Sequence, residues 1–253
     1  MRTVAQAPDQ QASGPPGRAA PARERGPEAC RGTVPGPGWK TSRQSWRLGG
    51  GAVTRRFVIK ARSAPTEAAA FRAAVGQGPR VEFLVRILVD ALFVAQGHRS
   101  DTVVHLVLER SQDFSRVVTF DGGVIGTLPG LTEAALVEAV AGPLDAARAL
   151  PKDGSLRTDV GVEVRATSFE HFVKELAGAG PLYLLDRRGD DIEGLTDVPD
   201  PTFVLTDHTP LPRNAARWLR RLGAQPLALG PTTLFASQCV TLLHSRLDRA
   251  AGF

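Results

Sequence analysis

The chain has few cysteines and no long uninterrupted apolar run. Its two cysteines, Cys30 and Cys239, lie far apart among 253 residues, a spacing that indicates neither a disulfide framework nor a clustered metal site. We therefore expect no bound metal and a reducing, cytoplasmic setting. The longest apolar stretches, 83–95 and 102–108, each contain charged residues or a histidine. Neither supplies the roughly 20 consecutive apolar residues of a membrane span, so we expect no membrane partner.

Several common catalytic and nucleotide-binding motifs are also missing. No G-x-G-x-x-G follows a predicted strand, and no G-x-x-x-x-G-K-[ST] occurs, which argues against a standard dinucleotide fold and against a P-loop. The G-x-S-x-G and H-E-x-x-H motifs are absent as well. If this chain binds a nucleotide-like ligand, it must do so through a different structural motif.

The positive charge is concentrated in the N-terminal region. The chain holds 31 Lys and Arg against 26 Asp and Glu, of which residues 1–56 hold 10 and 3, leaving 21 and 23 for residues 57–253. Residues 1–53 are rich in Pro, Gly, Ala, Gln and Arg, which predicts a disordered basic extension. An RNA-contacting arm, a targeting peptide and a mis-assigned start near Val53 are the alternatives, and the sequence favours the last. Residues 54–253 are expected to form one folded domain.

From residue 56 onward, predicted strands alternate with predicted helices. The strands are expected at 57–60, 102–108, 117–120, 161–165, 182–185, 203–206 and 227–229. The helices are expected at 79–96, at 131–150 with an interruption at Gly142-Pro143, from a Thr167/Glu170 capping box to about Ala177, at 214–222, and at 234–249. This alternation predicts an α/β fold, with a mostly parallel sheet and helices on both faces.

Two of these strands end in turns that can form a ligand site. The strand at 203–206 runs into Asp207, and the next strand runs into Gly230. The carboxyl ends of parallel strands share one edge of a sheet, where α/β proteins bind ligands. We expect the two turns to be neighbours, with Ser237 and Cys239 facing the same crevice from the start of the last helix. On spacing alone, a helix cap at Asp207 and packing roles for the two small residues remain open.

Five segments in order resemble the archaeal tRNA pseudouridine N1-methyltransferases of the TrmY type. They are Phe57–Thr66, Asp90–Asp101, Val104–Leu108, Asp200–His208 and Leu229–Cys239. Each segment alone is weak evidence for the family, but the five together, in the right order, are specific and span nearly all of residues 56–249. The chain departs from the family at Thr206, where a glycine is usual, and in the first long helix, which has aliphatic residues where the family often has cysteine.

The resemblance implies a SPOUT fold with a C-terminal trefoil knot, an exception to the rule that chains avoid knots. It also implies a homodimer, S-adenosylmethionine as the methyl donor, and methyl transfer to N1 of a pseudouridine in the T-loop of tRNA. The cofactor contacts that it implies, largely through main chain, are Leu205, Asp207, Leu229, Gly230, Leu234, Ser237 and Cys239.

N1 of pseudouridine is a ring N–H and a poor nucleophile until its proton leaves, so the reaction needs positioning and a general base. Asp207 is the candidate for the base or for orienting the ring, and Arg62 for stabilising charge on the uracil carbonyls. The candidate RNA contacts are Lys60, Arg62, Arg187 and Arg188. Each of these residues has a purely structural role as its alternative. A SPOUT methyltransferase acting on ribosomal RNA, or a non-catalytic RNA-binding homologue, remains open.

Overall fold

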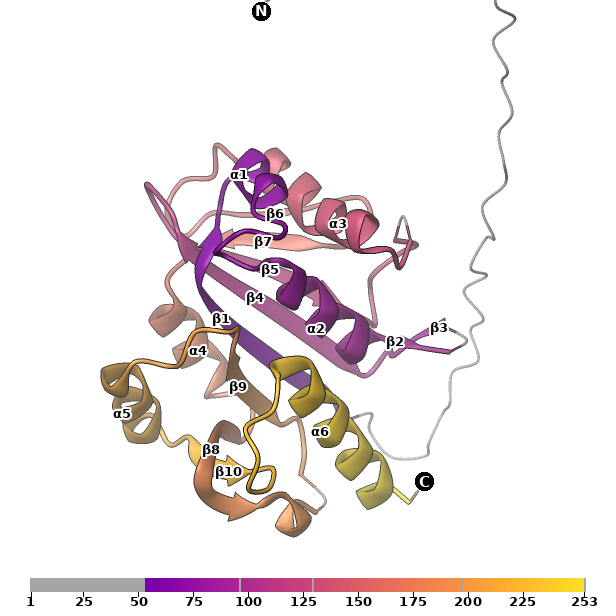
Figure 1. The fold of residues 1–253 in the computed structure, drawn as a ribbon, viewed down its shortest axis with the longest axis vertical. Helices are drawn as coiled ribbons and strands as arrows, with labels where there is room; N and C mark the ends of the chain where they lie inside the picture. Colours follow the sequence, from indigo (N-terminus) through magenta and orange to yellow (C-terminus); the bar gives the residue numbers. More distant parts are fainter. Residues whose placement is uncertain (1–52, 96, 129, 197, 253) are drawn as a thin grey trace, which may run out of the picture. The chain divides into compact units, whose positions relative to one another are not determined.

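The computed structural model describes residues 53–252 except 96, 129 and 197, so the predicted N-terminal extension lies almost entirely outside the described residues. Eight strands form one sheet in the order β10-β8-β9-β1-β4-β5-β7-β6 (Figure 1). Their bounds are Arg55–Pro65 (β1), Thr102–Arg110 (β4), Arg116–Asp121 (β5), Ser155–Arg157 (β6), Glu163–Ala166 (β7), Leu182–Asp191 (β8), Thr202–Thr206 (β9) and Gln225–Ala228 (β10). A separate two-stranded hairpin pairs β2 (Phe93–Val94) with β3 (Gly97–His98).

The strands from β10 to β4 pair in parallel, and β5, β7 and β6 follow in antiparallel order. The prediction of a mostly parallel sheet is therefore confirmed. The short strand β6 was not predicted. Its three residues offer too few positions for a period of two to be recognised.

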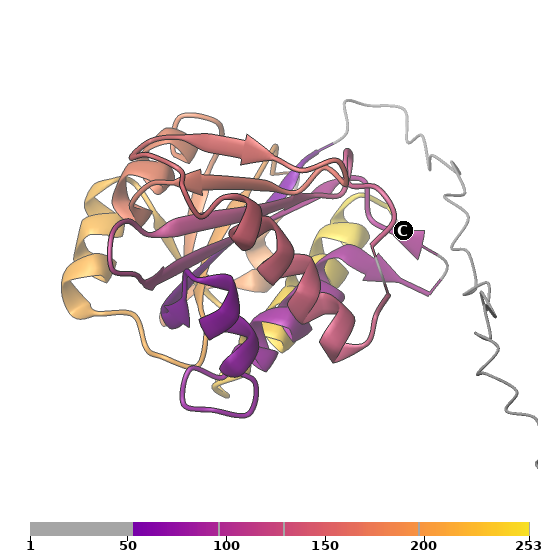
Figure 2. The same cartoon turned by 90° about the horizontal axis from the view of Figure 1, so that it is seen from above.

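Helices cover both faces of the sheet, as the alternation predicts (Figure 2). The helices α1 (Ala68–Ala73), α2 (Glu82–Leu92), α3 (Glu133–Ala146) and α6 (Ala236–Ala250) pack on one face, and α4 (Phe169–Leu176) and α5 (Arg213–Arg221) on the other. Strand β1 separates the two cores: Phe57 and Ile59 belong to the first and Val58 to the second, because side chains alternate along a strand. No helix within the described residues is long and apolar enough to cross a membrane.

The predicted interruption at Gly142-Pro143 is wrong, because α3 continues through Pro143 to Ala146. Proline removes one backbone hydrogen bond from a helix interior, which normally breaks it. Here Val140 and Leu144, on either side of the proline, are buried in the core. Tertiary packing therefore overrides the local preference at this position.

Two helix ends also differ from the sequence prediction. Helix α4 is capped by Ser168, whose hydroxyl accepts the backbone N–H of His171 at 3.2 Å, and not by Thr167. Helix α2 ends at Leu92 and not near residue 96, because Phe93 adopts an extended conformation and pairs with His98. In both cases the local sequence also fits the predicted helix end, and a specific contact decides against it: the Ser168 cap for α4 and the pairing of Phe93 with His98 for α2.

Strand β8 bends around β10. Pro226 of β10 pairs with Leu184, whereas Leu227, the next residue, pairs with Asp190. Between these pairings Gly189 packs directly on β10: a Cβ added there would lie 2.3 Å from the carbonyl carbon of Pro226. The two turns predicted to be neighbours do lie at the same edge of the sheet, but β8 separates their strands, so the expectation of neighbouring turns is corrected.

A buried polar network fixes α6 to the sheet. The Arg55 guanidinium contacts Asp248 Oδ1 at 2.6 Å and donates to His244 Nδ1 at 3.1 Å. His244 donates from Nε2 to the carbonyl of Ala91 in α2 at 3.0 Å, and Arg99 adds a second contact to Asp248 at 2.6 Å. Burial, reinforced by the nearby Arg99 and Arg55, lowers the pKa of His244 to about 3. The ring is therefore neutral and holds one defined tautomer.

This network predicts acid sensitivity. The pKa of His244 is about 3 in the fold against a reference value of 6.5, so the unfolded chain binds more protons between these pH values. The free energy of unfolding should fall as the pH drops below about 6.5, by up to about 1.4 kcal/mol per pH unit from this group. We expect the free energy of unfolding, measured by urea denaturation at pH values from 6.5 to 5, to depend less steeply on pH for His244→Gln than for the wild type. His171→Gln, at an exposed histidine, is the control; equal slopes for all three proteins would refute the assignment.

Candidate functional site

The candidate site lies where β9 ends and α6 begins. The side chain of Asp207, the residue after β9, is only 1% exposed. Its Oδ1 accepts the backbone N–H of Thr209 at 2.7 Å. Its Oδ2 has no hydrogen-bond partner among the described residues, since His208 Nδ1, at 3.9 Å, is too distant for a hydrogen bond. A buried, unpaired carboxylate oxygen is costly and typical of a site that receives a ligand or a proton.

Burial raises the pKa of Asp207 above its ordinary value, and the N–H of Thr209 and the positive charge of Arg62 oppose this rise. The group is thus a better proton acceptor than an exposed aspartate. The alternative role as a helix cap is wrong, because α5 starts at Arg213 after Pro212. Asp207 instead closes a local turn through Thr209.

A small cavity opens beside Asp207, with a volume of about 20 Å³. Phe83, Arg86 and Ile87 of α2 line one side, and His208, Phe235, Ala236 and Ser237 complete the lining. The ring centroid of Phe83 lies 5.6 Å from that of Phe235 and 5.9 Å from that of His208. The cavity holds about one water, so a larger ligand requires its lining, which includes the 58% exposed Phe235, to rearrange.

The loop after β10 has the backbone freedom that the sequence indicated. Gly230 adopts φ +110, which favours glycine, and a Cβ added there would meet nothing within 4 Å. The backbone at Gly230 is therefore open to approach. Leu205 is buried, and Leu229 and Leu234 are half-buried. None of Leu205, Leu229, Gly230 and Leu234 lines the cavity beside Asp207.

The start of α6 contributes Ser237 and Cys239. Ser237 is buried and lines the cavity. Cys239 is half-buried against the core, and burial raises the pKa of its thiol to about 11. The thiol is therefore neutral and unsuited to act as a nucleophile.

The basic residues predicted to contact RNA differ in their exposure. Arg62 is exposed near the end of β1, and Arg187 and Arg188 are exposed in the bent part of β8. Lys60 is 4% exposed: it pairs with Glu109, and its Nζ lies 3.9 Å from the centroid of the Phe169 ring. A buried, paired ammonium is unsuited to a direct phosphate contact, so the prediction for Lys60 is corrected to a structural role.

Sequence reasoning missed the contribution of α2. Phe83 and Arg86 lie outside the apolar stripe that predicted this helix, and Arg86 lies 6.0 Å from the Phe83 ring centroid. An aromatic residue off the buried stripe was the available signal. The sequence alone does not show that this face of α2 lies opposite His208 and Phe235, because that arrangement depends on tertiary structure.

Comparison with known proteins gives a consistent assignment. A family model described as "Putative SAM-dependent RNA methyltransferase" matches residues 54–251. A protein of Vibrio atlanticus named "Putative pseudouridine methyltransferase" is 44% identical over 194 residues, which cover 77% of this chain and 98% of that protein. A protein of Shewanella baltica (strain OS185) with the same name is 46% identical over the same shares.

A solved structure supports the fold. The crystal structure of Archaeoglobus fulgidus Nep1 bound to S-adenosylhomocysteine matches with a TM-score of 0.55 over 79% of this chain and 100% of that chain. At 13% sequence identity, this likeness shows the fold alone. It supports the mostly parallel α/β fold with helices on both faces that the sequence predicts.

The unpaired oxygen of Asp207 predicts an unusual effect on stability. Asp207→Asn keeps the Oδ1 acceptor for Thr209 but removes the buried charge. We expect the free energy of unfolding at pH 7 to stay equal or to rise by about 1 kcal/mol, because functional sites are often locally unfavourable to stability. Urea denaturation measures this. A loss of more than about 1 kcal/mol would show that the carboxylate stabilises the fold.

Proposed function

The chain belongs to the family of SAM-dependent RNA methyltransferases, and from this membership we propose that it transfers the methyl group of S-adenosylmethionine to N1 of a pseudouridine in the T-loop of tRNA. The observation that carries the proposal is the buried Asp207 carboxylate, whose Oδ2 has no partner within the described part of the chain. The name shared by the bacterial relatives supports pseudouridine as the substrate nucleoside. Residues 54–253 form the proposed catalytic domain.

The residues proposed to hold the methyl donor fit such a ligand in their chemistry. The Gly230 backbone is open to approach, and Leu229 and Leu234 near it in the chain are apolar and half-buried. When bound, S-adenosylmethionine supplies an electrophilic methyl group attached to a sulfonium leaving group. The proposed contacts are Leu205, Asp207, Leu229, Gly230, Leu234, Ser237 and Cys239.

The chain's own residues perform the proton and charge steps. Asp207 Oδ2 accepts the proton of the pseudouridine N1–H, and the N1 lone pair that this releases forms the new bond to carbon. Burial raises the pKa of Asp207, which strengthens it as a proton acceptor, and the positive charge of Arg62 partly opposes this rise. Arg62 also stabilises negative charge that develops on the uracil carbonyls.

Further parts of the proposal concern assembly and substrate contact. The bend of β8 around β10, with Gly189 against Pro226, supports a C-terminal chain that threads a trefoil knot. The resemblance described above supports a homodimer acting in the cytoplasm. Arg62, Arg187 and Arg188 are the proposed RNA contacts, because all three are exposed.

The proposal predicts a large catalytic defect in Asp207→Asn. With tRNA that carries pseudouridine and a saturating methyl donor, kcat should fall by about 10²- to 10⁴-fold, the range expected for loss of a general base. Asp186→Asn, at a carboxylate that pairs with Arg220 and does not line the Asp207 cavity, is the control and should keep wild-type kcat. An Asp207→Asn enzyme within threefold of wild type would remove Asp207 from the mechanism.

The substrate is tested separately in cells. Mass spectrometry of nucleosides from purified tRNA and ribosomal RNA, with and without the gene, should show N1-methylpseudouridine lost from tRNA alone. Loss from ribosomal RNA would overturn the tRNA assignment while leaving the methyl transfer intact. No loss from either RNA would oppose the enzyme assignment and favour a non-catalytic RNA-binding role.

A further inference from the structure

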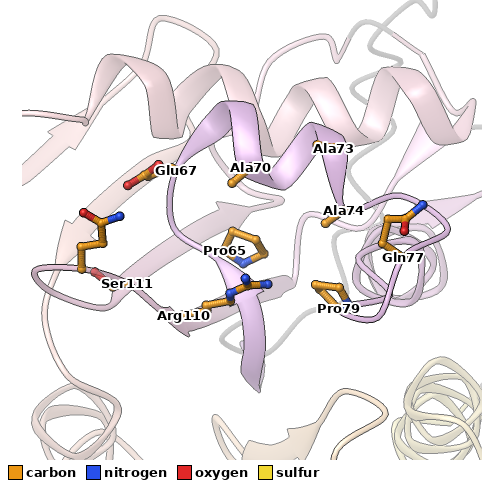
Figure 3. A pocket seen from close by; sticks show the side chains of 10 residues that line it. Pro65, Glu67, Ala70, Ala73, Ala74, Gln77, Pro79, Arg110 and Ser111 are labelled. Carbon is orange, nitrogen blue, oxygen red and sulfur yellow. The ribbon is translucent and has the colours of Figure 1, made fainter.

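A second, larger cavity lies at the same edge of the sheet as Asp207. Its volume is about 460 Å³, within the range of small-molecule sites. It is formed where β1 and β4 end, beneath α1 and the loop that leads to α2 (Figure 3). Its lining residues are Pro65, Glu67, Ala70, Ala73, Ala74, Gln77, Pro79, Arg110, Ser111 and Gln112. None of the residues proposed to hold the methyl donor is among them.

Two chain segments connect this cavity to the reaction site. On β1, the carbonyl of Lys60 accepts the backbone N–H of Asp207 at 3.4 Å, Arg62 follows two residues later, and Pro65, three residues further along, lines the cavity. Three strand residues span about 10 Å. In the second segment, Pro79 lines the cavity and Phe83 lines the Asp207 pocket. The two sites are therefore close enough to contact one strand of substrate.

The lining combines flat apolar surfaces with one cation. The rings of Pro65 and Pro79 and the short side chains of α1 leave space for a planar group. Arg110 is exposed, and its side chain extends across the cavity toward Pro79 (Figure 3). Glu67 is the one carboxylate in the lining, and it points away from the centre of the cavity.

The surroundings favour an anionic occupant. Arg80, directly after Pro79, is exposed, and its guanidinium lies 5.7 Å from the centroid of the Phe83 ring. Its backbone has φ +50, a conformation that non-glycine residues rarely adopt. Arg62, Arg80 and Arg110 thus present positive charge along the path from one cavity to the other. Guanidinium groups bind phosphates and stack on unpaired bases, the parts that single-stranded RNA exposes.

We propose that this cavity binds a nucleotide next to the modified one in the same RNA strand, with its base between Pro65 and Pro79 and its phosphate on Arg110. The proposal rests on the proposed function for the identity of the strand. It assigns the cavity a role in RNA affinity and none in binding the methyl donor. Neither the likeness to relatives nor the chemistry at Asp207 requires this second site.

The test fills the cavity and measures RNA binding directly. Ala70→Trp places an indole in the cavity, whereas Ala69→Trp adds the same group to an exposed position of α1 outside the lining. The probe is a fluorescein-labelled single-stranded RNA with the T-loop sequence. Its binding is measured by fluorescence anisotropy in the absence of methyl donor. We expect Ala70→Trp to raise the Kd at least tenfold and Ala69→Trp to leave it within twofold.

A charge variant tests the phosphate contact. Arg110→Gln should reduce the slope of log Kd against log salt by about 0.7, the value for one phosphate contact to a single strand. Arg148→Gln, at an exposed arginine that is not in the lining, should leave this slope unchanged. Both cavity variants should keep wild-type affinity for S-adenosylmethionine and wild-type kcat at saturating RNA.

The outcomes separate this proposal from the proposed function. Equal RNA affinity of Ala70→Trp and Ala69→Trp, or absence of RNA binding by the wild type, would overturn the nucleotide site. Conversion of a dimer to monomers by Ala70→Trp, seen by sedimentation, would instead assign the cavity to an interface between copies of the chain. Failure of the wild type to bind S-adenosylmethionine would overturn the proposed function alone, because the anisotropy assay contains no methyl donor.

Discussion

The buried contact of Arg55 with Asp248 and His244 determines where the closing helix lies, and the candidate site depends on that position. Ser237 precedes His244 by seven residues, about 10 Å along a helix. A shift of one residue in this contact would rotate α6 by about 100° and turn Ser237 away from the cavity that it shares with Asp207. The network is distant from the chemistry, yet it holds the two sides of the proposed methyl-donor site together.

Two charged residues near this edge, Lys60 and Asp207, are both buried but differ in whether their polar atoms have partners. Lys60 is paired with Glu109 and covered by the Phe169 ring, so its charge is satisfied inside the fold. Asp207 keeps one oxygen without a partner among the described residues, and burial raises its pKa. The first arrangement stabilises the fold, whereas the second is favourable only when a ligand or a proton completes it. This contrast supports the proposed role of Asp207 in the reaction and a structural role for Lys60.

Much of the fold follows from sequence because its strands are long and apolar. The runs at 57–60 and 102–108 predict β1 and β4, and these two strands pair in parallel within the mostly parallel sheet that the sequence predicts. Features that depend on single positions were harder to predict from the sequence. Burial of Val140 and Leu144 carries α3 through Pro143, and the bend of β8 around β10 depends on the close approach of Gly189 to Pro226. Such contacts join residues far apart in the chain and leave no local period.

The candidate site was predicted only in part for the same reason. Asp207 and Gly230 follow apolar strands, a pattern that can be recognised in sequence. Phe83 enters the site from a distant helix, and the exposure of Lys60 depends on α4. The central claim is that the edge formed by β9, β10 and α6 binds a methyl donor, and calorimetric titration with S-adenosylhomocysteine tests it most directly. The account predicts saturable binding at one site per chain in the wild type and none in Ser237→Arg. Absence of saturable binding in the wild type, or full binding by the variant, would contradict it.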